Sequence, residues 1–196
     1  MSKKLLLWMM VVTLFTSMTT SAWGQVTAPL TEDFEAGWPT TWSQDPATAP
    51  STWSVGNNLL ANVNPFGGSA YLALYATTQQ QAVKAVLPLV DMSNTTTPEL
   101  TFRRVQKARG AVTGYARDTL KIYGRTAVNS PWLLLQTIDS EAATWTLTTV
   151  DLSFLVGGTM QVALEYVFGG VMGIAIDNLH MGDPSQCIVP NGLQAY

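Results

Sequence analysis

The chain of 196 residues is 47% hydrophobic and only 12% charged, and it contains seven Trp but one His and one Cys. A single His excludes a two-His zinc centre, and a single Cys excludes an internal disulfide. Low charge combined with many Thr, Val and aromatic residues favours β-sheet over helix.

Residues 1–24 have the three-part pattern of a secretory signal peptide. Two lysines precede an apolar run over residues 5–15, and a region of small and polar residues follows, which places the cleavage near Gly24–Gln25. The apolar run is shorter than the roughly 20 residues that span a bilayer, and no second run follows. We therefore expect an exported, extracellular or cell-surface chain whose mature part has no membrane span.

Charge is distributed unevenly along residues 25–196. All eight basic side chains lie between Lys84 and Arg125, whereas the thirteen acidic ones occur throughout, which gives a net charge of −5. This balance disfavours nucleic acid as a partner. The segments on either side of the basic region contain acids but no Lys or Arg. If those segments meet in the fold, something other than a local base must balance their charge.

Short segments with alternating apolar residues recur along the chain, separated by clusters of Gly, Pro, Asn and Asp. In chain order, the expected strands are 71–75, 82–90, 99–105, 118–125, 145–152, 159–168 and 173–182. The segment 82–90 alternates through Leu87 and Leu89, although Pro88 indicates a strand end or an edge. No segment has a sustained helical period. The pattern predicts an all-β antiparallel sandwich or barrel.

The last expected strand, "GIAIDNLHMG", has a carboxylate among apolar residues. A strict period of two places Ile174 and Ile176 on one face and Leu179 and Met181 near the other. Asp177 lies between them, in a strand whose apolar residues predict burial on both faces. Its charge therefore requires a partner from another part of the chain.

Several motifs, taken in order, resemble those of a known family. They are "EDFEAGWPTTW" (32–42), "STWSV" (51–55), "GGSAYLAL" (67–74), "LTFRRV" (100–105) and "AIDNL" (175–179), the last followed by Cys187. This order resembles the MAM-like jelly rolls, in particular the choice-of-anchor J and cleaved-adhesin domains of secreted Bacteroidetes proteins. The resemblance implies a two-sheet, galactose-binding-like jelly roll over residues 25–183, with its first and last strands close together. It also implies a role in adhesion or surface binding, and often a structural calcium ion.

Residues 184–196 are predicted to form a linker. Pro190, Asn191 and Leu193 resemble the start of a fibronectin type III repeat, which implies further domains downstream. Cys187 would then be a free thiol or would pair outside this segment.

The resemblance carries the two metal-binding acids over to Glu35 and Asp177. Two carboxylates brought together repel each other, and Ca²⁺ would solve this by taking six to eight oxygen ligands. Asp33 or a loop carbonyl would complete the shell. The alternative is that Asp177 accepts hydrogen bonds from backbone N–H groups of a turn. Two features depart from the family pattern: Asn178 replaces a second acid, and the disulfide partners of extracellular MAM domains are absent.

Two groups of residues are candidates for ligand binding. Trp38, Trp42 and Trp53 would stack on sugar rings if exposed, or would belong to the core if buried.

The second candidate group is the basic set Arg103, Lys107 and Arg109 in and beside the predicted hairpin 104–117. These residues would meet an acidic glycan, a phosphate surface or a partner protein, or would form a solvated face. In a strand, Arg104 points away from the other three.

Catalysis is disfavoured by the residues present. A Ser-His-Asp triad would have to use His180, which a period of two places on the face opposite Asp177. The chain contains no G-x-S-x-G, H-E-x-x-H or phosphate-binding loop. We therefore predict a secreted, calcium-stabilised, non-catalytic adhesion module that binds a surface protein or a glycan. The alternatives are a carbohydrate-binding module and an accessory domain of a secreted peptidase or glycosidase.

Overall fold

The computed structural model describes residues 25–49, 51–75, 82–106, 118–153, 158–169 and 173–184. The predicted signal peptide, the predicted linker with Cys187, and the basic residues Lys107 and Arg109 lie outside these ranges. Within them the chain has no α-helix, and so no helix long and apolar enough to cross a membrane. The strands are β1 (Val26–Thr27), β2 (Leu30–Glu32), β3 (Ser43–Asp45), β4 (Ser54–Gly56), β5 (Tyr71–Leu74), β6 (Ala82–Val86), β7 (Val90–Asp91), β8 (Glu99–Gln106), β9 (Thr119–Arg125), β10 (Leu133–Ile138), β11 (Ala142–Asp151), β12 (Thr159–Val167) and β13 (Ile174–Gly182).

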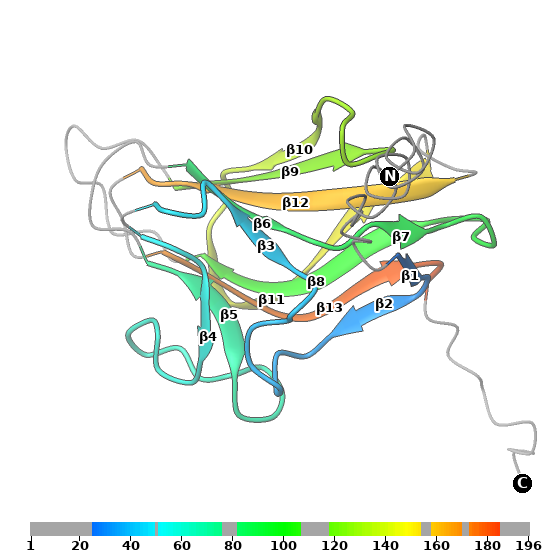
Figure 1. Ribbon diagram of the computed structural model, residues 1–196. Coiled ribbons are helices and arrows are strands. Elements are labelled where there is room, and N and C mark those ends of the chain that lie inside the picture. Colours follow the sequence, from blue (N-terminus) through cyan, green and yellow to red (C-terminus); the bar gives the residue numbers. More distant parts are fainter. Residues whose placement is uncertain are drawn as a thin grey trace, which may run out of the picture.

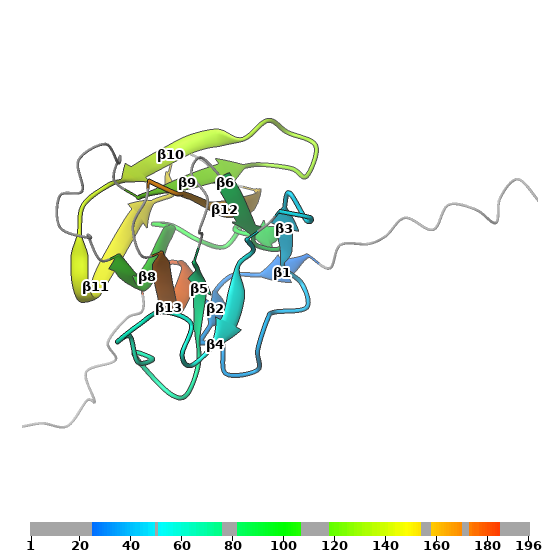
Figure 2. The same ribbon diagram turned by 90° about the vertical axis from the view of Figure 1, so that its left-hand side faces the viewer.

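These strands form two sheets that pack face to face (Figure 1). In the seven-stranded sheet, β12 pairs with β9 on one side and with β6 and β7 on the other; β10, β3 and β1 lie outside these. In the six-stranded sheet, β13 pairs with β8 on one side and with β5 and β2 on the other, and β11 and β4 form the edges. Among the described strands, only the short β1–β7 pair is parallel. The predicted two-sheet antiparallel sandwich is confirmed, and Figure 2 shows its two layers from the side.

The first and last parts of the domain are neighbours in the six-stranded sheet. Strand β2 pairs with the end of β13, where Glu32 lies opposite Leu179. This places the acidic segment that follows β2 beside the acidic part of β13. The expected proximity of the first and last strands is therefore present.

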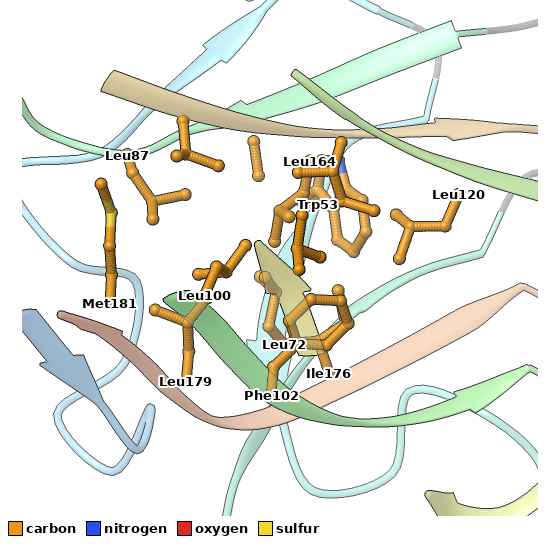
Figure 3. Close-up of a cluster of buried hydrophobic side chains, with 14 of the residues drawn as sticks. Trp53, Leu72, Leu87, Leu100, Phe102, Leu120, Leu164, Ile176, Leu179 and Met181 are labelled. Carbon is orange, nitrogen blue, oxygen red and sulfur yellow. The ribbon is translucent and has the colours of Figure 1, made fainter. Parts of the chain in front are cut away.

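The hydrophobic core fills the space between the two sheets (Figure 3). Every second residue of β12 points into it, as predicted: Met160, Val162, Leu164 and Tyr166, all fully buried. Phe102 of β8 is likewise fully buried and faces them from the other sheet. Alternation with a period of two thus decides which face of a regular strand such as β12 is buried.

The predicted strand 82–90 is divided at Pro88. Strand β6 ends at Val86 and β7 begins at Val90, and both pair with β12. Leu87 is buried as expected, but Leu89 is not, and Val90 is buried in its place. Pro88 lacks an N–H and interrupts the ladder, so the alternation resumes one residue later than predicted.

The predicted faces of β13 are wrong after Asp177. Asn178 has a φ of 47°, and the pairing of β13 with β8 shifts between Asp177 and His180, which is a β-bulge. The extra residue reverses the alternation, so Leu179 and Met181 join Ile176 in the core.

The same bulge changes the position of His180. His180 pairs with Thr101 and Asp177 pairs with Arg103. Thr101 and Arg103 alternate along β8 with core residues, so both pairs point away from the core. The expectation that His180 and Asp177 lie on opposite faces is therefore incorrect.

The core predicts a clear stability difference between a buried and an exposed apolar residue. We expect Phe102→Ala to lower the free energy of unfolding by roughly 3–5 kcal/mol, because it removes a fully buried ring and leaves a cavity. Leu133, which is 49% exposed on β10, is the control, and Leu133→Ala should cost less than about 1 kcal/mol. Urea unfolding followed by Trp fluorescence measures both values. Equal losses would show that the interior is not packed as described.

Candidate functional site

A long connection between β4 and β5, residues 57–70, folds over the outer face of the six-stranded sheet. We call it the covering loop; in Figure 1 it extends below β4 and β5. Its Leu60 and Val63 are buried in a second, smaller apolar cluster, together with outward-facing residues of the sheet such as Ala175. The Tyr71 hydroxyl accepts hydrogen bonds from the N–H groups of Leu59 and Leu60, at 3.0 and 2.9 Å. The covering loop is therefore part of the folded domain, with its own small core.

Asp177 is fully buried beneath this loop. Its Oδ2 accepts hydrogen bonds from the N–H groups of Phe66 (2.9 Å) and Gly67 (3.3 Å), and its Oδ1 accepts one from Asn178 (2.7 Å). Burial raises the pKa of Asp177, and the nearby charge of Glu35 adds to this, whereas the three N–H donors act in the opposite direction. Asp177 therefore accepts hydrogen bonds from backbone N–H groups, which was the alternative to metal binding that the sequence left open.

Glu35 holds the next part of the same loop. Its Oε1 accepts hydrogen bonds from the N–H groups of Ser69 (2.8 Å) and Ala70 (2.9 Å), and its Oε2 accepts one from the Ser69 hydroxyl (2.7 Å). The Ser69 hydroxyl and the backbone donors lower the pKa of Glu35. Asp33 accepts a hydrogen bond from the Glu35 N–H (3.2 Å), which closes a turn. The structure thus brings Glu35 and Asp177 to one loop, with Asp33 adjacent in sequence.

Gly68 is required where Glu35 meets the loop. It has a φ of +59°, and a Cβ at this position would lie 2.4 Å from the Glu35 carboxyl group. Only glycine combines that backbone conformation with such a close approach. The "GGS" motif therefore accommodates the Glu35 carboxylate: Gly68 leaves the space, and Ser69 donates hydrogen bonds to it.

Arg103 lies beside this arrangement on the same outer face. It pairs directly with Asp177 of β13 on one side and with Leu147 of β11 on the other. Its guanidinium carbon lies 4.7 Å from the centre of the Phe66 ring, a cation–π contact. Among the described residues the one ion pair within 4 Å joins Lys84 and Glu165, so Arg103 does not form a salt bridge with Asp177.

The neighbouring Arg104 points the other way, as the alternation predicts. It is 5% exposed and donates hydrogen bonds to Thr148, Gln106 and Ser140. Arg104 is therefore a structural residue at the end of the core, and Arg103 remains the accessible member of the pair.

Trp145 and Leu147 of β11 lie beside the Arg103–Phe66 contact. Phe66 is 43% exposed and Leu147 is 53% exposed. Trp145 meets the Phe66 ring edge-on, with centroids 6.2 Å apart, and its Nε1 donates a hydrogen bond to the carbonyl of Asn64 (2.9 Å). We refer to Phe66, Arg103, Trp145 and Leu147 as the outer-face patch. Sequence reasoning did not single out Phe66, although an aromatic residue in a Pro- and Gly-containing loop was the available signal.

The three tryptophans that were candidates for sugar stacking lie elsewhere. Trp53 is buried and donates a hydrogen bond from Nε1 to the carbonyl of Val83 (3.0 Å), and Trp42 is buried as well. Trp38 is half-buried and packs edge-on against Trp42, with centroids 6.2 Å apart. Trp42 and Trp53 therefore belong to the core and present no ring face to a ligand.

His180 is also engaged by the backbone. Its Nε2 lies 2.9 Å from the carbonyl oxygen of Asp183, so this nitrogen acts as a donor. Within the described part of the chain, no group of three or more His, Cys, Asp or Glu side chains is placed to hold a metal ion.

The fold has clear counterparts among solved structures. The K1 cleaved adhesin domain of Lys-gingipain from Porphyromonas gingivalis W83 superposes with a TM-score of 0.62 at 21% identity, covering 79% of this chain and 98% of that one. The chain has the fold of a cleaved adhesin domain. The K2 domain of Lys-gingipain gives a TM-score of 0.59 at 14% identity, over 79% and 99% of the two chains.

This cleaved-adhesin-like jelly roll also resembles a carbohydrate-binding module. TmCBM61, solved in complex with β-1,4-galactotriose, superposes with a TM-score of 0.52 at 8% identity over 76% of this chain and 92% of that one. No model of a known protein family and no curated protein matches the chain. At these identities the likeness establishes the fold.

The close approach at Gly68 gives a test of the Glu35 contact. We expect Gly68→Ala to destabilise the domain more than Gly37→Ala. Both residues have positive φ, but only at Gly68 does the new Cβ meet another group. Thermal unfolding measures the difference in melting temperature between the two variants. Because both variants carry the backbone strain, this difference reports the clash of the new Cβ with the Glu35 carboxylate. Equal melting temperatures would contradict the described contact.

The buried carboxylate gives a test by pH. The folded-state pKa of Asp177 is raised above the ordinary value of 3.8, so the folded protein binds more protons than the unfolded chain between the two pKa values. The free energy of unfolding should therefore fall, through this group, as the pH rises from 3.8 to above the folded-state pKa.

The variant Asp177→Asn lacks this titration. We expect the variant to gain stability relative to the wild-type chain as the pH rises across that window, measured by urea unfolding with a chelator present in both samples. Glu35 and Asp183, whose pKa values are lowered, contribute to both proteins and largely cancel in the difference. If the stability difference between the two proteins stays constant across this pH window, burial does not raise the pKa of Asp177 as described.

Proposed function

We propose that this chain is an exported, non-catalytic binding module that attaches a larger protein to a surface glycan or a surface protein. The observation that carries the proposal is the outer-face patch, in which Phe66 of the covering loop and Leu147 of β11 are exposed beside the half-buried Arg103 of β8. Clustered, exposed aromatic and apolar side chains of this kind are typical of interaction sites. The fold supports the proposal, because it occurs in adhesin domains and in a module solved with galactotriose.

Export and the absence of catalysis belong to the same proposal. Export is supported by the signal-peptide pattern of residues 1–24, and attachment to further domains by the linker-like sequence after residue 183. The non-catalytic role is supported by the sequence, which has one histidine and contains no G-x-S-x-G, H-E-x-x-H or phosphate-binding loop.

A carbohydrate-binding module is the form of this function that the patch favours. The exposed Phe66 ring flanked by Trp145 offers an apolar surface for the C–H face of a sugar ring. The aromatic surface is formed by these two residues, in place of the tryptophans near the N-terminus.

A glycan array tests this function. We expect the purified chain to bind at least one saccharide, and Phe66→Ala to reduce that binding about tenfold or more, because aromatic anchors commonly contribute over 1 kcal/mol to binding. Leu133→Ala, on the opposite sheet, is the control and should leave binding unchanged. An array without any saccharide bound, together with no loss of surface-protein binding in Phe66→Ala, would contradict the role of the patch.

We also propose that Ca²⁺ binds near Asp177 and Glu35. In favour of the ion, the two carboxylates converge on one loop, and neither forms an ion pair with the described basic residues. Both carboxylates already accept several N–H donors, so an ion would need most of its remaining oxygen ligands from backbone carbonyls and water. Its role would be structural: it would offset the charge of Asp177 and hold the covering loop.

Calcium binding would stabilise the folded chain by mass action. We expect the melting temperature to rise with added Ca²⁺ and to fall with EDTA, and Asp177→Asn to lack this response. Mg²⁺ at the same concentration is the control, because it accepts such irregular oxygen sites poorly. Identical melting curves with and without EDTA would contradict the calcium proposal.

A further inference from the structure

We propose that the outer-face patch recognises an anionic saccharide, with its carboxylate or sulfate on Arg103 and its ring against Phe66. This inference rests on the proposed binding function and specifies the ligand class of the same site.

The Arg103 side chain has unused hydrogen-bond donors. A guanidinium group carries five N–H donors in a planar fork that matches a carboxylate or sulfate. The guanidinium carbon of Arg103 lies 4.7 Å from the centre of the Phe66 ring, and this cation–π contact is not a hydrogen bond to any of the five N–H donors. Within the described part of the chain, the Arg103 side chain makes neither a hydrogen bond nor an ion pair.

The acid closest in the ladder does not neutralise Arg103. Asp177 lies directly opposite it, but the Asp177 carboxylate is buried and accepts hydrogen bonds from three backbone N–H groups. Its charge is turned toward the covering loop, whereas the Arg103 guanidinium is turned over Phe66 at the surface. Arg103 is thus positioned by its cation–π contact with Phe66, and no described acid forms an ion pair with it, so its positive charge is available to a ligand.

The described surroundings of Arg103 contain little other positive charge. On the six-stranded sheet, Arg103 and Arg104 are the described basic residues, and Arg104 is buried. The same outer face ends in acids at Glu99 and Asp151, which are paired across β8 and β11. Asp177, opposite Arg103, and the nearby Glu35 reduce the attraction at the Arg103 end, and Glu99 and Asp151 repel an anion at the other end. Arg103 is thus the accessible described cation of this face, and an anionic group of a ligand would contact its guanidinium.

The neighbouring polar side chains favour a sugar over an acidic peptide. Between the two ends lies a row of polar side chains across three strands, Thr149, Thr101 and His180. Hydroxyl and imidazole groups of this kind suit the hydroxyl groups of a sugar ring. The stacked Phe66–Arg103 pair supplies a flat surface beside them. A flat apolar platform, one cation and a row of hydroxyls match a saccharide that carries one anionic group per ring or per few rings.

Three probes separate the possibilities in a titration followed by calorimetry. They are oligogalacturonate, which carries carboxylates, a sulfated galacto-oligosaccharide, and the neutral β-1,4-galactotriose. We expect one or both anionic probes to bind at least tenfold more tightly than galactotriose. Which of the two binds better identifies carboxylate or sulfate as the group recognised. Raising the salt from about 50 to about 500 mM should weaken the anionic probe and leave the neutral one nearly unchanged.

Four variants test the residues. Arg103→Gln should weaken the anionic probe at least tenfold and have little effect on galactotriose, and Phe66→Ala should weaken all saccharides. Lys121→Gln removes the same charge from the other sheet, and it should bind as the wild-type chain does. Phe66→Tyr keeps the ring and should retain binding, and melting curves of every variant exclude loss of folding as the cause.

The outcomes that overturn the inference are distinct from those that overturn the function. Galactotriose binding that equals the anionic probes and is insensitive to Arg103→Gln would refute the anionic ligand but leave the binding module standing. Binding of poly-glutamate through Arg103, with no saccharide bound, would refute the saccharide and favour an acidic protein partner. No binding of any probe or surface protein would overturn both proposals.

Discussion

The outer face of this domain depends on the hydrogen bonds between the buried Asp177 carboxylate and the backbone of the covering loop. A carboxylate transferred out of water costs several kcal/mol unless donors surround it, and the loop supplies them through Phe66 and Gly67. The loop in turn depends on Asp177, because its N–H groups at this point are paired with that carboxylate. The same contact positions the Phe66 ring over Arg103 and so creates the exposed patch.

The bulge at Asn178 makes this arrangement compatible with a continuous core. In a regular strand, Ile176, an inward-facing residue, would be followed by another at position 178 and by outward-facing residues at 179 and 181. The bulge inserts one residue, so Leu179 and Met181 return to the core and Asp177 stays outside it. The cost is a non-glycine residue with positive φ, which asparagine tolerates better than most residues.

The same chemistry holds other loops of the domain. Asp183 accepts hydrogen bonds from the N–H groups of Thr96 and Thr97, and Asp118, which is buried, accepts from Gly169 and from the Tyr166 hydroxyl. Of the acids in the two end segments, Glu35, Asp177 and Asp183 thus find partners in backbone N–H groups of loops. This answers the question that the charge distribution raised, in a way that does not depend on whether an ion is also bound.

Much of the fold was predictable from the residues, and the limits were physical. Long strands with strict alternation, such as β12 and β9, were found because a period of two repeated over seven or more residues is a strong signal. The strands β1 to β4 have only two or three residues and carry no period, and β10 lacks alternation because it lies at an edge with exposed Leu133 and Leu134. The candidate acids Glu35 and Asp177 were placed together through a family resemblance.

By itself, the sequence determined the all-β class, the inward face of regular long strands such as β12, and the presence of two acidic end segments that contain no Lys or Arg. The tertiary structure decided which groups those acids meet, which tryptophans are buried, and that Arg103 stacks on Phe66. The reason is distance along the chain. A strand's alternation is a property of adjacent residues, whereas the contact between Asp177 and Phe66 joins positions 111 residues apart. That contact exists only because two sheets, one bulge and one covering loop bring the two residues together.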